Sequence, residues 1–428
     1  MIKRLAAVLL WSIIAAAFIG PGTVTAAASA GADFGYALLW ALLFSTIACL
    51  VLQEASGRLT VVSGKSLGEA LRLRYPAGWR RGAILVLVLG AVVLGCAAYE
   101  AGNILGGVAG AVFILPWSPR SLAVATVVAA GLLLFFNSPR RVALLLSVLV
   151  ATMGLAFLWT AIRLAPPWAE VFAGVLRPAL PEGSSLLALA LVGTTVVPYN
   201  LFLGSGLARG QTLAELRFGL TVAVLFGGLI SMGVLVVGAA LQGTFGFEAL
   251  AGVLVERLGP RAQGLFGAGL LAAGLSSAVT APLAAAMTVR SVFGKEEDRR
   301  WADRSWRFRS VWGGVLVVGL VFGVSGMQAV PVIIMAQALN GVLLPAVSVF
   351  LLLAVSDRSL MGRAVNGLGS NIVMSLVTLV TLLLGTAGVL RAGARALGQP
   401  PPGQALLLVV ALAVAVAVGV PVLRSFRS

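Results

Sequence analysis

The chain has 428 residues, of which 60% are hydrophobic and 10% are charged, and its mean hydropathy is +1.06. These values exclude a soluble globular protein and predict an integral membrane protein. The net charge of +16 does not indicate nucleic-acid binding, because the basic residues stand in short loops beside apolar runs, where lipid headgroups are the natural partner. Histidine is absent, so no imidazole serves as a metal ligand or proton relay.

Apolar windows of spanning length follow one another along most of the chain. They predict an all-α, polytopic membrane protein with eleven or twelve transmembrane helices. The windows lie near residues 6–30, 35–54, 83–112, 120–137, 142–164, 184–207, 218–242, 262–289, 310–327, 330–354, 368–390 and 405–423.

Loops rich in Lys and Arg alternate along the chain with loops that contain few of them. Because cytoplasmic loops carry an excess of Lys and Arg, this pattern predicts that both termini are cytoplasmic and that the protein lies in the inner, or cell, membrane. The rich loops contain Lys3 and Arg4, Lys65 to Arg81, Arg140 and Arg141, Arg209 and Arg217, Arg290 to Arg309, Arg358 and Arg363, and Arg424 and Arg427.

Two of the windows are interrupted near their centres. The first contains Gly20-Pro21-Gly22-Thr23 and the sixth contains Val197-Pro198-Tyr199-Asn200. Proline removes a backbone donor and clashes with the preceding turn, so an undistorted helix cannot cross either sequence. Freed peptide groups at membrane depth are tolerated where they line a polar cavity or are buried in protein. A matching pair of broken helices therefore predicts a substrate site near the bilayer midplane.

The two breaks each open a block of five spans. An odd number of spans inverts the second block relative to the first, as in many secondary transporters. We expect a first repeat over residues 1–165, a second over 184–356, and appended spans over 366–428. The run Val62 to Ser66 ends like a nucleotide-binding loop, but Leu59 stands where its first glycine is required. We therefore expect a transporter that is neither ATP-driven nor an enzyme.

Several motifs resemble those of the Nramp family of divalent-metal transporters, and the resemblance covers roughly residues 10–385. It implies a LeuT-type fold of the APC superfamily, with a 5+5 inverted repeat whose first and sixth helices are broken. The motifs are Phe34 to Trp40, Leu52-Gln53, Gly57 to Leu67, Gly274 to Ser277, Gln337, Leu344-Pro345 and Met361-Gly362.

The chain departs from the family at both breaks. The family carries Asp-Pro-Gly-Asn in the first broken helix and Met-Pro-His-Asn in the sixth, and the Asp, Asn and Met side chains bind its metal. The corresponding ligand positions here are Gly20, Thr23 and Val197. The family's second histidine is Gly204, and an alanine before the methionine is Thr194. The resemblance thus indicates a divergent member without the family's metal ligands.

The remaining site residues are neutral. We expect no formal negative charge at the midplane, and half-helices that begin near Thr23 and Asn200 would turn their positive ends toward a ligand. This favours a small anion, for example bicarbonate. Two alternatives stay open: a divalent cation such as Mn²⁺ or partly hydrated Mg²⁺, and a sensor that does not transport. The predicted substrate site comprises Gly20, Pro21, Gly22, Thr23, Thr194, Val197, Tyr199, Asn200 and Gln337.

Candidate coupling residues lie on other spans. The family's acidic pair in the third span is Glu100 and Asn103 here, and a carboxyl inside a span is typically functional, so proton coupling through Glu100 is one prediction. The alternative is an ion pair with Arg309. Sodium coupling is a second prediction, at Ser276, Ser277 and Thr280. No cofactor is expected, the partners are a small inorganic ion and the bilayer, and a monomer is the expected functional unit.

Overall fold

The computed structural model describes residue 11 and residues 19–74, 78–136, 139–294, 298–397, 399–400 and 402–425, and they are nearly all helical. Ten stretches of these residues are long and apolar enough to cross a membrane. They comprise α3 (Leu39–Ser63), α5 (Trp79–Ala111), α6 (Pro119–Phe136), α7 (Pro139–Arg163), the pair α9 (Ser185–Thr195) and α10 (Pro198–Leu207), α11 (Leu213–Gly238), α13 (Arg261–Phe293), α14 (Trp306–Val324), α15 (Ala329–Val355) and α17 (Leu368–Ala396).

Two further helices account for the remaining predicted windows. α2 (Pro21–Phe34) is the second half of the predicted first span, and α18 (Gln404–Ser425) is the predicted last span. The predicted first half of span one, before residue 19, lies outside the described residues except for Trp11, which is buried. The predicted cytoplasmic position of the N-terminus also falls there.

The largest difference from a predicted boundary is at the end of the second span. The second span was expected to end at residue 54, but α3 continues to Ser63. Its polar residues beyond position 54 all find partners: Ser56 donates its hydroxyl to the Leu201 carbonyl at 2.6 Å, and the Thr60 hydroxyl lies 2.7 Å from that of Ser205. Because these groups are satisfied on α10, they do not end the helix.

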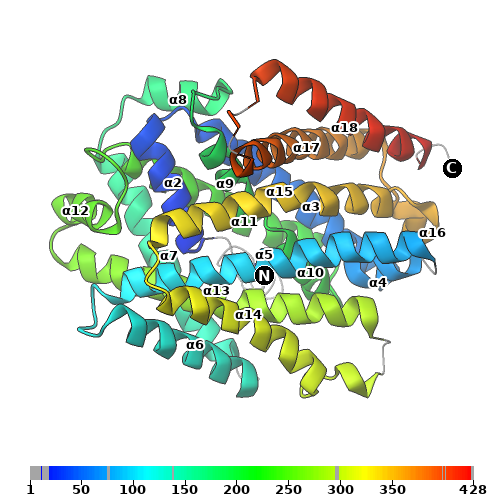
Figure 1. Ribbon diagram of the computed structural model, residues 1–428, viewed down its shortest axis with the longest axis horizontal. Helices are drawn as coiled ribbons and strands as arrows, with labels where there is room; N and C mark the ends of the chain where they lie inside the picture. The colour runs from blue at the N-terminus through cyan, green and yellow to red at the C-terminus, as the bar shows by residue number, and fades with distance from the viewer. Residues whose placement is uncertain are drawn as a thin grey trace.

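Short helices lie at the two ends of the bundle. In Figure 1, α8 (Trp168–Leu176) and α12 (Phe247–Leu258) lie at one end of the long axis, and α4 (Leu67–Arg74) and α16 (Arg358–Met361) lie at the other. The remaining short elements are 3-10 turns, η1 (Arg299–Trp301) and η2 (Gly362–Ala364).

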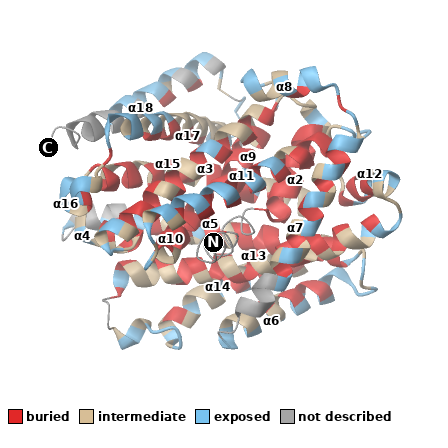
Figure 2. Ribbon diagram, turned by 180° about the vertical axis from the view of Figure 1, so that it is seen from behind, coloured by how far each residue is buried: buried red, intermediate tan, exposed pale blue. Residues whose placement is uncertain are grey.

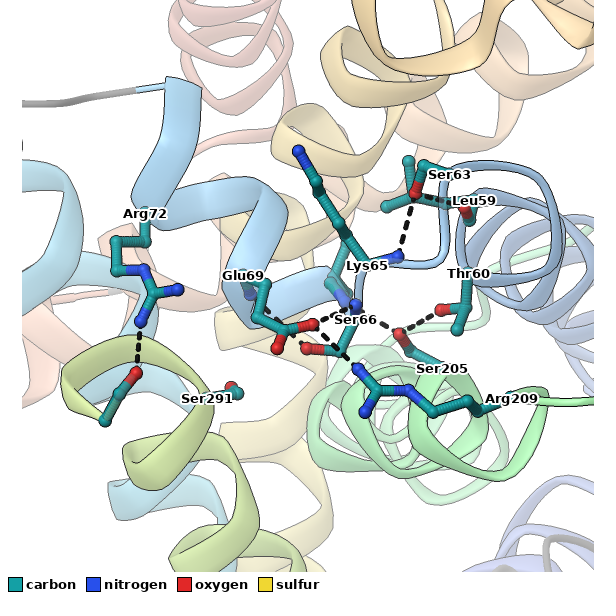
Figure 3. A network of polar contacts seen from close by, with 12 residues as sticks. Leu59, Thr60, Ser63, Lys65, Ser66, Glu69, Arg72, Ser205, Arg209 and Ser291 are labelled. Carbon is teal, nitrogen blue, oxygen red and sulfur yellow. Dashed lines mark hydrogen bonds and ion pairs between the residues drawn. The ribbon is translucent and has the colours of Figure 1, made fainter. Parts of the chain in front are cut away.

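The α4 end gathers loops that the sequence predicted to be cytoplasmic. Arg74 pairs with Asp357, and Arg209 pairs with Glu69 at 3.1 Å. Figure 3 shows that the Glu69 carboxylate also accepts from the Ser66 amide, close to the Ser205 hydroxyl of α10. The positive-inside pattern thus agrees with one end of the molecule, while its assignment to the cytoplasm stays a prediction.

The packing of the helices exchanges partners between the two predicted repeats. α2 packs against α11, and α10 packs against α3, so each half-helix contacts the second span of the other block. In the same way, α5 packs against α15 and α13 packs against α7. Such an exchange is what two repeats related by a twofold axis produce. The residue boundaries of the three segments, 1–165, 184–356 and 366–428, stay predictions.

The broken helices occupy the middle of the bundle. In the apolar 18-residue window within Ser185–Leu207, 94% of the residues are buried, whereas in Pro119–Phe136 only 22% are, and Figure 2 shows buried residues concentrated along α2, α9 and α13. The outer helices, α6 among them, present apolar side chains to the surroundings, as a lipid-facing surface requires. The fold therefore places both breaks away from lipid, surrounded by protein.

Candidate functional site

The half-helix that follows each break begins at a proline. α2 starts at Pro21 after an extended Gly20 (φ −106°, ψ −175°), and α10 starts at Pro198 after an extended Val197 (φ −82°, ψ 126°). Proline suits the first helical position because its fixed φ matches the helix and its missing N–H has no helical partner there. The break between α9 and α10 confirms the prediction for the sixth span. The half-helices start two residues before the predicted Thr23 and Asn200.

The two breaks meet through a pair of threonines. The Thr23 hydroxyl lies 2.8 Å from the Thr194 hydroxyl, and both side chains are fully buried. Thr194 is also a side-chain hydrogen-bond partner of Tyr99 on α5. Thr195 behaves differently, because its hydroxyl donates to the Leu191 carbonyl of its own helix at 3.1 Å. Thr23 and Thr194 therefore bond across the two breaks, as a shared site requires.

Gln337 of α15 contacts both broken segments. A Cβ on Gly22 would collide with the Gln337 carboxamide. A Cβ on Gly193 would collide with the Gln337 carbonyl oxygen and the Gly341 amide nitrogen. Gly193 thus allows the backbone of α15 to approach the sixth-span break closely, and Gly22 leaves room for the buried Gln337 side chain at the first break.

Tyr199 and Asn200 begin α10 and are each 1% exposed. Neither the Tyr199 hydroxyl nor either carboxamide atom of Asn200 has a hydrogen-bond partner among the described residues. The Tyr199 ring packs edge-on against Tyr99, with ring centroids 5.5 Å apart. Since a buried polar group without a partner is costly, these atoms indicate a place for water or a ligand.

The break in the sixth span frees one backbone carbonyl, that of Thr194. The helical partner of the Thr194 carbonyl would be the N–H of residue 198, which is proline, so that bond cannot form. In contrast, the Thr23 amide donates to the Gly20 carbonyl at 3.1 Å, and the Asn200 amide donates to the Val197 carbonyl at 3.0 Å. This differs from the expectation that the amides near Thr23 and Asn200 point at a ligand.

Glu100 lies on α5 and is fully buried. One of its oxygens accepts a hydrogen bond from the Asn103 carboxamide at 3.4 Å, and the other has no partner in the described part of the chain. The alternative ion pair with Arg309 is not formed, because the Arg309 guanidinium lies 4.2 Å from the centroid of the Phe135 ring. A carboxyl group thus stands within the bundle with a single weak partner.

The predicted sodium residues on α13 are not all oriented alike. The Ser276 hydroxyl donates to the Ala273 carbonyl at 3.1 Å, and the Thr280 hydroxyl donates to the Ser276 carbonyl at 2.7 Å. Both bonds lie within the helix. Only Ser277 is fully buried with a hydroxyl that lacks a partner among the described residues. A sodium site on the three residues stays a prediction.

Two polar residues near the site were missed by sequence reasoning. Gln53 of α3 is buried, its Oε1 lacks a partner in the described residues, and a Cβ on Gly204 would collide with that atom. Asn340 lies three residues after Gln337 on α15, is fully buried, and has no partner for either carboxamide atom there. The available signal was a second carboxamide in the apolar run 329–355 at helical spacing from Gln337.

Comparison with known proteins identifies the family of this chain. The profile of the Nramp family, natural resistance-associated macrophage protein-like, matches residues 12–391. The chain belongs to the Nramp family. The divalent metal cation transporter MntH of Yersinia pestis is 27% identical over 391 residues, which cover 86% of this chain and 91% of the relative. MntH of Verminephrobacter eiseniae is 28% identical over 402 residues, 89% of this chain and 88% of the relative.

Solved structures confirm the predicted fold. A manganese transporter variant from Eremococcus coleocola superimposes with a TM-score of 0.72 at 20% identity, covering 99% of this chain and 93% of the other. Mhp1, a nucleobase-cation-symport-1 family transporter, gives a TM-score of 0.58 at 18% identity, covering 98% and 92%. The chain is therefore an Nramp protein with the broken-helix fold of the LeuT-type transporters, as the motifs indicated.

Proposed function

We propose that this Nramp protein is a secondary transporter of a hard divalent cation, Mg²⁺ or Mn²⁺, which crosses the membrane with part of its water shell. Bacterial relatives that match most of the chain are named divalent metal cation transporters. This relationship favours a cation over bicarbonate, which none of these names supports. It also favours the inner membrane as the location.

The observation that carries the proposal is an excess of unpaired side-chain oxygen acceptors inside the bundle, two of them at the breaks, on Asn200 and Gln337. Among the described residues, buried side-chain nitrogen atoms without partners occur only on two carboxamides, Asn200 and Asn340. Carbonyl or carboxylate oxygens of that kind are more numerous, and a cation or the waters around it would satisfy them. They belong to Gln53, Glu100, Asn103, Asn200, Gln337 and Asn340.

The ligand types point to the class of cation. Thr23, Asn200, Gln337 and the Thr194 carbonyl offer neutral oxygens, which suit Mg²⁺ and Mn²⁺. Neutral donors offset only part of the dehydration cost of a divalent ion, so retained waters must complete its shell. Val197 supplies no thioether, and the site therefore lacks the soft ligand that favours later transition metals.

Glu100 is the proposed coupling group. Its carboxyl lies on α5, the helix that also carries Tyr99, a hydrogen-bond partner of Thr194. A carboxyl buried in the membrane without a cationic partner suits reversible protonation. We infer that inward movement of the cation is accompanied by proton movement through Glu100. Sodium binding near Ser277 is the competing coupling mode.

The test is uptake into proteoliposomes that contain a divalent-cation indicator or a pH-sensitive dye. Gradients of Mg²⁺, Mn²⁺ and bicarbonate are applied in turn, each with and without sodium. We expect saturable entry of Mg²⁺ or Mn²⁺ with acidification of the lumen. Alkalinisation by bicarbonate without metal entry would restore the anion hypothesis, and binding of metal without any flux would indicate a sensor.

A further inference from the structure

A cavity of about 730 Å³ lies away from the breaks. It is bounded by the second half of α3, the first turns of α11, and the segment from Ala364 into the start of α17. By side-chain type its lining divides into an apolar set, called the apolar wall, and a charged set of Glu54, Arg58 and Arg217, called the charged wall. The apolar wall includes Leu50, Val51, Leu220, Val373 and Met374.

The charged wall has an excess positive charge. Arg58 binds the Glu54 carboxylate at 3.1 Å, and Arg217 binds the same carboxylate at 2.8 Å. One carboxylate thus serves two guanidinium groups. Arg58 is fixed further by bonds to the Ala364 carbonyl at 2.7 Å and the Asn366 side chain at 2.6 Å, and its side chain is 8% exposed. Arg217 has a side chain that is 57% exposed and is therefore the accessible member.

The helices around the cavity also expose apolar side chains. The same three helices expose Ile47, Val222, Ile372 and Leu376, with exposed fractions of 42–59%. Arg58 and Arg217 lie near the ends of two of these helices, and the ends of membrane-spanning helices are where phospholipid phosphates lie. A ligand that reaches this cavity from the membrane therefore meets positive charge and an apolar wall together.

We propose that the cavity binds one anionic phospholipid. Its phosphate pairs with Arg217, with Arg58 behind it, and an acyl chain lies along the wall that includes Leu220 and Val373. The volume is within the range of roughly 300–1,000 Å³ of small-molecule pockets in proteins, so it holds part of one lipid and not the whole molecule. α3 packs on α10 and α11 packs on α2, so the lipid touches the two helices that support the half-helices.

The test measures lipid binding to the purified full-length protein by native mass spectrometry. Dioleoyl phosphatidylglycerol is compared with dioleoyl phosphatidylcholine, which has the same chains and no net charge. We expect one tightly bound phosphatidylglycerol, weakened about fivefold in Arg217→Gln, the effect of one arginine near an anionic lipid surface. Arg209→Gln is the matched control, because Arg209 is 52% exposed, pairs with Glu69 (Figure 3) and is not among the residues that line the cavity.

Two more variants separate the effect of charge from the effect of apolar contact. Arg217→Lys retains the charge and is expected to retain most of the binding, while Val373→Trp fills the apolar wall and is expected to weaken it without changing charge. Equal losses in Arg217→Gln and Arg209→Gln would overturn the proposal in favour of diffuse surface attraction. Equal binding of phosphatidylcholine, or displacement of the lipid by glycerol phosphate at the same concentration, would also overturn it.

Discussion

The Thr23–Thr194 pair tests whether the two breaks form one site. The hydroxyls are 2.8 Å apart and fully buried, so Thr23→Val, which keeps the shape and removes the hydroxyl, leaves a buried group without this partner. Such a loss costs about 1–3 kcal/mol of unfolding free energy. Thr194→Val should cost a similar amount. The double variant should cost about 1 kcal/mol less than the sum of the single variants, because the shared bond is lost only once.

The assay combines stability with transport. Unfolding of the wild type, both single variants and the double variant is followed in the same detergent, and cation uptake is measured in liposomes. If the Thr23 hydroxyl is a ligand, Thr23→Val lowers kcat/KM about tenfold, which corresponds to about 1.4 kcal/mol. Thr23→Ser keeps the hydroxyl and is the control, with uptake near that of the wild type.

Two outcomes of these measurements would contradict the assignment of the site. Additive stabilities in the double-mutant cycle would show that the two hydroxyls do not interact. Wild-type uptake by Thr23→Val, together with normal folding, would remove the breaks as the place where the cation binds.

Three further predictions concern the coupling residue, the metal ligands and the packing of α15. Glu100→Gln should abolish the dependence of metal uptake on a pH gradient while metal binding persists, and an unchanged dependence would exclude Glu100 from coupling. Gly20→Asp combined with Val197→Met should raise Mn²⁺ affinity by at least about tenfold in titration calorimetry, whereas no gain would show that these positions do not face the ion. Gly193→Ala should destabilise the protein by about 1–3 kcal/mol, because the new Cβ meets the backbone of α15. The control is Gly90→Ala, whose Cβ meets nothing within 4 Å and should change stability by less than about 1 kcal/mol. Equal effects of the two substitutions would refute the packing argument.

The sequence was a good guide to the spans and breaks. Proline and glycine act locally, so the starts of α2 at Pro21 and of α10 at Pro198 follow from covalent structure. Hydropathy found the other spans because each must bury about twenty residues in lipid. It failed at the end of α3, where Glu54 and Arg58 lower the local hydropathy but satisfy each other at 3.1 Å.

The site was only partly predictable. Thr23, Thr194 and Gln337 were chosen because they are polar residues at or near the breaks, and the structure brings them together. Asn340 was missed, although its spacing from Gln337 was visible, because spacing does not tell whether a side chain is satisfied. The predicted amide donors at Thr23 and Asn200 were already occupied by local turns, which depend on backbone angles that the sequence leaves open.

The sequence by itself thus determined the membrane class, most of the spans and the prolines at which α2 and α10 begin, since each depends on residues close together in the chain. Only the tertiary structure decided that Thr23 meets Thr194 across 171 positions and that Arg58 and Arg217 share one carboxylate beside a cavity. These contacts depend on how α2, α3, α9 and α11 pack against one another. Distances between such distant segments arise from the packing of the whole bundle, which no local pattern records.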